Sequence, residues 1–387
     1  VKVLKGTFKA GPFAAIPRKV LVVTQFTVSI VLIIGTIIVF KQVQFAKNRP
    51  VGYSRGGLVN IEVTNDDLHK HFGALKADLL KSGAVTEVAE SSSATTGLNN
   101  NRGDISWTGK DPSSSVFFGS IRVSTEYGKT VGWQFTQGRD FSDRYISDSL
   151  AVVLNETAVK YMGLKKPIGE IVNVGKRDLT VIGVVKDMVM ESPYEPVKQT
   201  IFYLGRGAYD DMLIRINPGI SAHEAVEKIA TVCKMYSPSV PFSYKFADDE
   251  YARKFSNEQR IGKLASVFAG LAIFISCMGL FGMASFVAEQ RVKEIGVRKV
   301  LGASVFGLWR MMSKDFVVLV IISVIIAIPL SYRFMDSWLQ HYTYHTSLSW
   351  WVFALTAAGA LLVTLLTISY QSIKAALANP LKSLRSE

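Results

Sequence analysis

Four long runs of apolar residues without a charged side chain dominate the chain. A helix needs about 20 residues to cross a hydrocarbon core of roughly 30 Å, and three of the runs reach that length. The third run is shorter, but Asp315 and Arg333 flank it and can extend their polar groups to the interface. Gln25 and Ser29, one turn apart in the first run, predict a polar stripe that faces neighbouring helices. The predicted transmembrane helices are residues 20–40, 264–288, 316–332 and 346–373.

The segment between the first and second runs, residues 41–263, has the alternating patterns of a folded domain. A strand pattern, a helical pattern and a second strand pattern follow one another near its start, and the same order returns near its end. Between these β-α-β units, the apolar residues of an insertion, residues 104–204, alternate mostly as in strands. The predicted elements are the strands 58–64, 84–90, 116–123, 151–154, 180–185, 199–203, 212–216 and 242–246 and the helices 66–81, 156–162 and 221–235.

These patterns predict an integral membrane α-helical protein with four transmembrane helices and a large α+β extracytoplasmic domain. The domain combines a split βαβ subdomain with an inserted strand-rich subdomain. Residues 91–102, rich in Ser, Thr and Asn, predict a flexible loop at the boundary between the two. Residues 248–263 predict a polar stalk helix that continues without a break through the second span to residue 288, over roughly 60 Å.

The net charge of +13 is unevenly distributed. Basic residues gather before the first span, between the second and third, and after the fourth, whereas Arg333 is the only Lys or Arg between the third and fourth. Short basic segments remain in the cytoplasm. Because the basic excess follows the membrane edges rather than one folded face, we expect no nucleic-acid partner. The sequence predicts residues 1–19, 289–315 and 374–387 inside, and residues 41–263 and 333–345 outside.

Motifs for catalysis or for holding a cofactor are missing from the sequence. The text nearest to a phosphate-binding loop, residues 169–176, has one residue too many and is followed by Arg where Ser or Thr must bind Mg²⁺. His341 and His345 are four residues apart but lack a third ligand nearby. Cys233 lies in the extracytoplasmic segment and Cys277 in a span, so the two cannot pair. We expect no enzyme activity, metal or cofactor in this chain.

The segment between the second and third spans is short, basic and amphipathic. Ile295, Val297, Val300 and Leu301 recur at near-helical spacing, and a Gly-Ala-Ser sequence at residues 302–304 then interrupts the pattern. A piece of this length and charge cannot cross a bilayer. It predicts an amphipathic helix, a turn and a second helix that lie against the cytoplasmic face of the membrane, where a partner can push on them.

The ten residues from Glu294 to Ala303, EIGVRKVLGA, follow an apolar span and resemble a signature of the FtsX-like, MacB-type permeases of ABC transporters. Residues 138–188 are similar to that family's periplasmic core domain, and residues 17–40 to its first span in tandem eight-span members. The resemblance covers essentially the whole chain. It implies a bacterial inner-membrane protein that works with a separate cytoplasmic ATPase, the subunit that binds ATP.

The resemblance also implies where that ATPase docks and what the chain does. Glu294, Arg298 and Lys299 would form the polar side of the docking helix, and Ile295, Val300 and Leu301 would face an apolar surface. Transmission of the ATPase's motion would drive export or extraction of a substrate. The alternative is a non-transporting, FtsX-like signalling subunit that activates a cell-wall hydrolase. The residues assigned to ATPase coupling are Glu294, Ile295, Gly296, Arg298, Lys299, Leu301 and Gly302.

Further partners implied by the resemblance are a second permease half or protomer, membrane lipid and a periplasmic adaptor. Gly270, Gly279 and Gly282 permit close helix packing, which suits either an interface between two such halves or packing within the chain. Residues 1–5, VKVLK, align with residues 381–385, LKSLR. This repeat predicts that the chain is the second half of a tandem eight-span permease. An alternative start codon is the other explanation.

Overall fold

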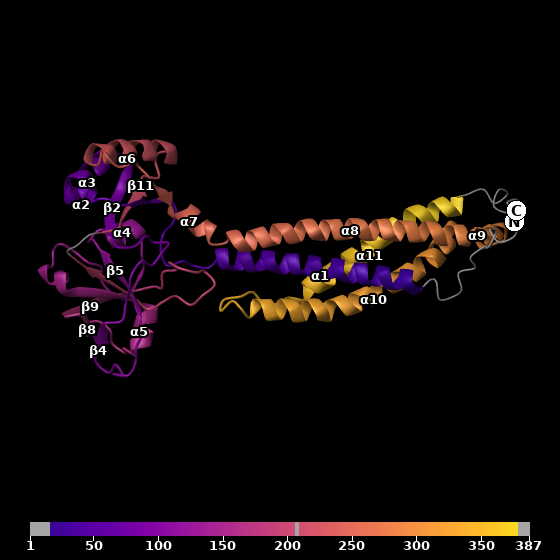
Figure 1. The fold of residues 1–387 in the computed structure, drawn as a ribbon, viewed down its shortest axis with the longest axis horizontal. Helices are drawn as coiled ribbons and strands as arrows, with labels where there is room; N and C mark the ends of the chain where they lie inside the picture. The colour runs from indigo at the N-terminus through magenta and orange to yellow at the C-terminus, as the bar shows by residue number, and fades with distance from the viewer. Residues whose placement is uncertain (1–15, 206–208, 378–387) are drawn as a thin grey trace, which may run out of the picture. The chain divides into compact units, whose positions relative to one another are not determined.

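A computed structural model of the chain describes residues 16–205 and 209–377. It divides into two compact units (Figure 1). The helical unit comprises the chain up to Phe45 and from Asn257 onward, and the sheet unit comprises Ala46–Ser256. The sequence repeat between residues 1–5 and 381–385 lies outside the described residues.

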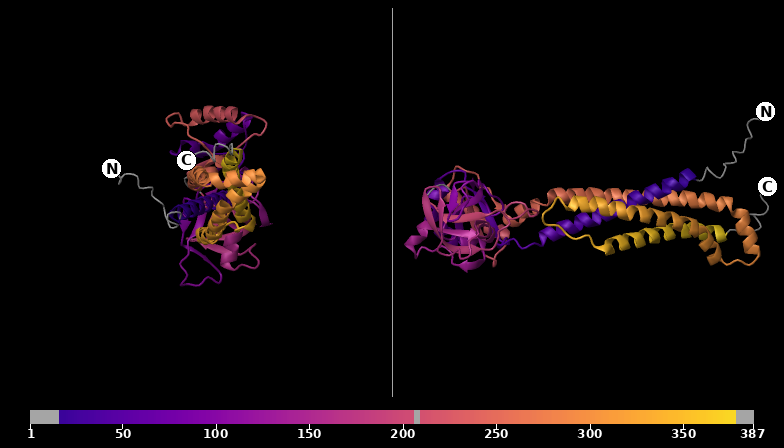
Figure 2. Two further views of the ribbon diagram at one scale, coloured as in Figure 1. Left: turned by 90° about the vertical axis from the view of Figure 1, so that its right-hand side faces the viewer. Right: turned by 90° about the horizontal axis from the view of Figure 1, so that it is seen from below.

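The helical unit contains four helices that are long and apolar enough to cross a membrane. Figure 2 shows these helices running alongside one another. Three of them extend beyond the predicted spans at both ends, because polar residues continue the helix outside each apolar run. The fourth begins at Trp350, four residues later than predicted. The helices are α1 (Ile16–Lys47), α8 (Ser256–Gln290), α10 (Val305–Leu339) and α11 (Trp350–Leu377), with the short helix α9 (Val292–Val300) between α8 and α10.

These helices pack through apolar clusters and a small number of hydroxyl groups. In hydrocarbon, helices associate through close packing and interhelical hydrogen bonds, since lipid tails are as apolar as Leu. The Ser29 Oγ lies 3.1 Å from the Ser276 Oγ of α8, and Gln25 lies against Gly279 of the same helix. The predicted polar stripe is therefore confirmed. The clusters include Val22, Phe26, Leu280 and Phe316 in one, and Ile30, Ile34, Ala327 and Leu339 in the other.

The connection between α10 and α11 is held to α1 by a buried amide. Gln42 is fully buried. Its Nε2 donates to the Tyr344 carbonyl at 3.0 Å, and its Oε1 accepts from the Thr346 N–H at 2.8 Å. Beside it, the Lys41 ammonium donates to the Ser349 Oγ at 2.9 Å. The Gln42 side chain thus makes hydrogen bonds with two backbone groups of the connection, which has no regular secondary structure to bond them.

We expect Gln42→Leu to lower the free energy of unfolding by about 2 kcal/mol, because the substitution removes two hydrogen bonds to partly buried backbone groups. Unfolding of the detergent-solubilised protein measures this change. Gln44→Leu is the matched control: Gln44 is exposed on the same helix, so its change should stay within about 0.5 kcal/mol. Equal effects of the two substitutions would contradict the role of Gln42.

The sheet unit is built on one mixed sheet. In the part of the chain that the structure describes, this sheet has twelve strands. The strand order is β12-β1-β11-β2-β5-β10-β7-β9-β8-β4, with β3 paired to β5 and β6 to β9. The strands are β1 (Leu58–Glu62), β2 (Val85–Ser91), β3 (Asn101–Arg102), β4 (Ile105–Trp107), β5 (Phe118–Val123), β6 (Phe135–Gly138), β7 (Ala151–Asn155), β8 (Ile171–Val174), β9 (Arg177–Val185), β10 (Thr200–Leu204), β11 (Asp211–Ile216) and β12 (Lys245–Phe246).

The first half of the sheet has the split βαβ arrangement that the sequence predicts. Helices α2 (Asp67–Lys70), α3 (Phe72–Lys81) and α6 (Ala222–Tyr236) lie together over β1, β11 and β2 (Figure 1). The predicted helix at residues 66–81 is interrupted at His71. The Ser221 Oγ caps α6 by accepting from the Glu224 N–H at 3.2 Å. Buried residues of this first core include Val59, Leu75, Leu79, Ile214 and Ile229.

The second half of the sheet has its own core, against helix α5 (Glu156–Met162), whose predicted bounds are confirmed. Here β5 and β10 run parallel, as do β7 and β9. The two cores match the two predicted subdomains, yet they share one sheet, because Ser91 of β2 pairs with Val123 of β5. Buried residues of the second core include Phe118, Val152, Leu154, Val181 and Ile201. The remaining helices of this unit are α4 (Tyr127–Val131), α7 (Ala247–Arg253) and the 3₁₀ helix Ile146–Leu150.

Residues 92–100 form the predicted boundary loop, and only its predicted flexibility was wrong. Ser92 and Ser93 are buried. The Ser92 Oγ accepts from the Arg122 N–H at 2.9 Å, and the Ser93 Oγ accepts from the Asn99 N–H at 3.0 Å. The buried hydroxyl groups of this segment accept hydrogen bonds from backbone N–H groups, so its polar composition reflects side-chain-to-backbone bonding.

The prediction of one unbroken stalk helix from residue 248 to residue 288 was also wrong. Helix α7 ends at Arg253 and α8 begins at Ser256. Phe255 is fully buried against the rings of Tyr194 and Tyr251. The Lys254 ammonium donates to the carbonyls of Thr96 at 2.7 Å and Met190 at 3.0 Å. Two consecutive side chains held inside the sheet unit interrupt the helix at this point.

Candidate functional site

The basic segment between α8 and α10 folds as the predicted helix, turn and second helix. Helix α9 ends at Val300, and Gly302 adopts φ +86°, a left-handed conformation that costs glycine little. The Ala303 N–H then donates back to the Arg298 carbonyl at 2.9 Å. The Ser304 Oγ caps the start of α10 by accepting from the Gly307 N–H at 3.1 Å. Local sequence therefore explains both where α9 stops and where α10 starts.

One side of α9 is fixed to the rest of the helical unit. Ile295 is only 5% exposed and packs in a small core with Ala288, Leu308 and Met312. These residues come from the end of α8 and the beginning of α10. Gly296, next to Ile295, is buried as well. Ile295 thus packs α9 against both neighbouring helices.

The other side of α9 is uncovered. Val300 is 68% exposed and Leu301 79% exposed, and Val297 is exposed as well. Ile295 therefore does not share one face with Val300 and Leu301, whereas the expectation that Val300 and Leu301 face an apolar surface stays a prediction. At about 100° per residue, positions two, five and six after Ile295 lie on other sides of the helix. The near-helical spacing of these apolar residues therefore does not place them on one face: Ile295 is on the packed side and the others are on the exposed side.

Charged residues accompany the uncovered apolar side chains. The Glu294 Oε1 lies 2.9 Å from the Arg298 Nη2, one helical turn away. Both side chains are exposed, so this ion pair contributes only about 0.3–0.5 kcal/mol to stability. Lys299 is half-buried. We define the α9 outer face as Glu294, Val297, Arg298, Val300 and Leu301.

Spatial neighbours that the sequence did not reveal complete the site. The Arg291 Nη2 lies 3.2 Å from the Asp315 Oδ2, which joins the end of α8 to α10. The Trp309 Nε1 donates to the Ser369 Oγ of α11 at 2.9 Å. Neither pair has a spacing that a motif could reveal, because the turn at Gly302 brings the first pair together and the return of the chain from α10 to α11 brings the second pair together.

The side chains exposed on the α9 outer face are apolar and charged. Within residues 16–205 and 209–377 no group of three or more His, Cys, Asp or Glu side chains is placed to hold a metal ion. His341 and His345 instead lie beside backbone carbonyls, those of Ser337 and Thr346. Exposed apolar side chains beside charges are typical of protein-binding surfaces.

Comparison with known families identifies the architecture. The model of the MacB-like periplasmic core domain matches residues 22–232, which is more than half of the chain. The model of the FtsX-like permease C-terminal domain matches residues 266–380. The chain belongs to the MacB/FtsX-type permeases of ABC transporters. Its four apolar helices and its periplasmic core domain are those of an inner-membrane protein with a periplasmic domain.

Individual relatives of this permease are distant. The macrolide export ATP-binding/permease protein MacB of Chromobacterium violaceum is 23% identical over 285 residues, which is 69% of this chain and 43% of the relative. MacB 2 of Aeromonas hydrophila is 23% identical over 214 residues, 52% of this chain and 32% of the relative. The crystal structure of the periplasmic region of MacB from Actinobacillus actinomycetemcomitans aligns with 54% of this chain and 96% of that one, at 18% identity and a TM-score of 0.40. The chain thus spans less than half the length of these curated relatives.

We expect Ile295→Ala to lower the free energy of unfolding of the permease by about 2–5 kcal/mol, because it empties part of the core behind α9. Leu301→Ala, on the exposed side of the same segment, should change it by less than about 0.5 kcal/mol. Unfolding of both variants in detergent measures the difference. A larger loss for Leu301→Ala would mean that the assignment of the two faces is reversed.

Proposed function

We propose that this chain is a permease subunit that receives conformational change from a cytoplasmic ATPase on α9 and passes it to the periplasmic sheet unit. The result is export or extraction of a substrate from the periplasm or the outer leaflet. The proposal rests on the two faces of the α9 segment. On one face Leu301 is exposed, and on the other Ile295 packs against α8 and α10. A helix of this kind can bind a partner and move its neighbours.

The charge distribution supports placing α9 in the cytoplasm. Arg291, Arg298, Lys299, Arg310 and Lys314 lie in this short connection, and such basic segments are retained inside. Both chain termini then lie inside, and the sheet unit lies across the membrane. ATP binding and hydrolysis belong to the partner subunit, and this chain supplies no catalytic residue.

Mechanical transmission suits these spans better than an aqueous pathway does. The four predicted spans contain no Asp, Glu, Lys or Arg, whereas polar pathways through a membrane are lined by such residues. Export is favoured over activation of a cell-wall hydrolase because the exterior matches the MacB-like periplasmic core domain. Substrate release and hydrolase activation are both measured with the ATPase present. Export predicts the first, and the signalling alternative predicts the second.

A second permease half or protomer would pack on α8. Within the chain, Gly279 packs against the Gln25 side chain. No described atom lies within 4 Å of a Cβ added at Gly270 or Gly282. Exposed glycines on an apolar helix allow the backbone of another helix to approach closely. Lipid and a periplasmic adaptor complete the proposed set of partners.

The orientation can be tested by cysteine labelling. Ile146 is 93% exposed in the sheet unit and Leu301 is 79% exposed in the helical unit. We expect Ile146→Cys to react with a membrane-impermeant maleimide in intact spheroplasts, and Leu301→Cys to react only after the membrane is opened. The unsubstituted chain is the control for Cys233 and Cys277. Labelling of both new cysteines in intact spheroplasts would contradict the proposed topology.

Coupling can be tested by exchanging the charges of the outer face. In the double variant Glu294→Arg with Arg298→Glu the ion pair reforms in reverse, so α9 should stay folded, but the charges presented to the ATPase are inverted. We expect ATP hydrolysis coupled to the permease to fall at least 10-fold, with normal insertion into the membrane. Gly296→Pro should have the same effect by breaking the helix.

The matched control exchanges an equivalent pair on α6, where the Lys228 Nζ lies 2.9 Å from the Glu224 Oε1. Glu224→Lys with Lys228→Glu should leave coupled hydrolysis unchanged. Normal hydrolysis in the α9 exchange would rule out docking at this face.

A further inference from the structure

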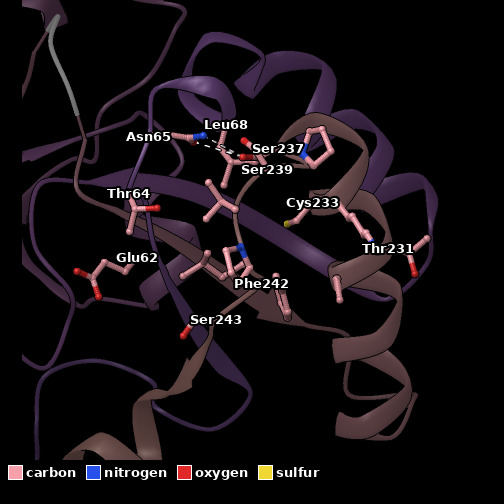
Figure 3. Close-up of a pocket in the computed structure, with 16 residues that line it drawn as sticks. Glu62, Thr64, Asn65, Leu68, Thr231, Cys233, Ser237, Ser239, Phe242 and Ser243 are labelled. Carbon is pink, nitrogen blue, oxygen red and sulfur yellow. Dashed lines mark hydrogen bonds between the residues drawn. The ribbon is translucent and has the colours of Figure 1, made fainter.

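A cavity of about 480 Å³ lies beside strand β1 of the sheet unit, next to the connection between α6 and β12 (Figure 3). Ile61, Glu62 and Thr64 all line it. Successive side chains of a strand point to opposite faces of the sheet, so a cavity that both Ile61 and Glu62 line must lie at the edge of the strand. A hydrogen bond of 3.1 Å from the Asn65 Nδ2 to the Ser237 Oγ closes one end of it (Figure 3).

Strand β12 covers only part of this edge. The described ladder between β1 and β12 ends at the pair of Asn60 and Lys245. If the same register continued, Pro241 would lie opposite Thr64. Proline has no N–H to contribute to a ladder, so the chain's own strand cannot complete the edge at Thr64.

The backbone groups of Glu62 and Thr64 face the uncovered edge. Along an antiparallel strand the N–H and C=O groups of alternate residues point to opposite neighbours. The Val63 N–H donates to the Asp210 carbonyl at 2.8 Å, on the side of β11. The groups of Glu62 and Thr64 therefore point the other way, toward the cavity. An edge of this kind is a template for a further strand.

The interior of the cavity suits an apolar side chain. Leu68 and Phe242 contribute apolar surface, and the buried Cys233 lies at its wall (Figure 3). Burial raises the pKa of Cys233 to about 12, so the thiol stays protonated and is not a nucleophile. The charged residues of the lining are one acid, Glu62, and one base, Lys234. Their charges balance, which favours an uncharged occupant.

An extended peptide meets both requirements. Its backbone supplies the donors and acceptors that the β1 edge lacks, and one of its alternate side chains can enter the cavity. A compact apolar molecule would fill the cavity but would leave the edge unpaired. We propose that this edge binds an extended, uncharged segment of a partner polypeptide by strand addition, with an apolar side chain in the cavity. The proposal does not depend on coupling through α9.

The experiment uses the full chain in lipid nanodiscs and three acetylated, amidated and fluorescently labelled heptapeptides in which Thr alternates with Val, Leu or Phe. Fluorescence anisotropy measures binding. Each peptide is also made with backbone N-methyl groups on one or the other set of alternate residues. We expect methylation of the set that faces β1 to weaken binding at least 10-fold, and methylation of the other set to change it less than twofold.

Variants of the chain locate the binding. Thr64→Pro removes the N–H that faces the edge, whereas Thr64→Val keeps it. Thr231→Trp fills the cavity from its exposed rim, whereas Thr231→Ala leaves it open. We expect the Pro and Trp variants each to weaken binding at least 10-fold and the two controls to stay within twofold. If Thr64→Pro does not fold, the comparison of Thr231→Trp with Thr231→Ala tests the proposal.

Three results would overturn the proposal. One is that none of the three peptides binds, as expected if Pro241 serves only to keep this edge from pairing. Another is that both methylated sets bind as well as the parent peptide. The third is that the Thr231→Trp variant binds like its control.

Discussion

Exclusion of charge from the hydrocarbon is the constraint on which the architecture of this permease depends. A charged side chain at the centre of a bilayer costs at least about 2.5–3.5 kcal/mol, and packing between helices in lipid offers little to offset it. Charged groups are therefore confined to the helix ends. There they make specific contacts: Lys41 with Ser349 at one connection, and Arg291 with Asp315 at another. The contacts between helices that involve charged groups are thus gathered at the helix ends, whereas neutral hydroxyl groups such as those of Ser29 and Ser276 meet between the ends.

The same constraint gives α9 its two faces. Because the segment is too basic to enter the bilayer, we expect it to lie at the edge of the membrane, and the buried Ile295 packs it against α8 and α10. The residues that remain, Val297 and Leu301 among them, have no partner surface within the described helical unit and stay exposed. One face of α9 packs against neighbouring helices and the other is exposed. The proposed transmission of force requires both properties.

In the sheet unit, two cores share one continuous sheet. Backbone pairing between Ser91 and Val123 joins them, so a displacement of one half is carried to the other through hydrogen bonds rather than through a flexible linker. Where α7 ends, Phe255 is buried and the neighbouring Lys254 ammonium is bonded to the carbonyls of Thr96 and Met190. At the edge of β1 the opposite holds, since pairing with β12 ends at Asn60 and Lys245, and the backbone groups of Glu62 and Thr64 beyond that pair face the cavity.

Sequence alone determined the features that depend on local pattern and composition. Runs without charge gave four spans, alternation gave the two βαβ units, and the EIGVRKVLGA motif with Gly302 located the turn after α9. Only the tertiary structure decided which side of each element is covered. Val300 and Leu301 have the same apolar character as Ile295 but not its neighbours. The helix broke at Lys254 because carbonyls distant in sequence bind that ammonium, and the buried Ser92 hydroxyl accepts from the distant Arg122 N–H. Residue type and spacing encode local conformation, whereas burial depends on partners that only the folded chain brings together.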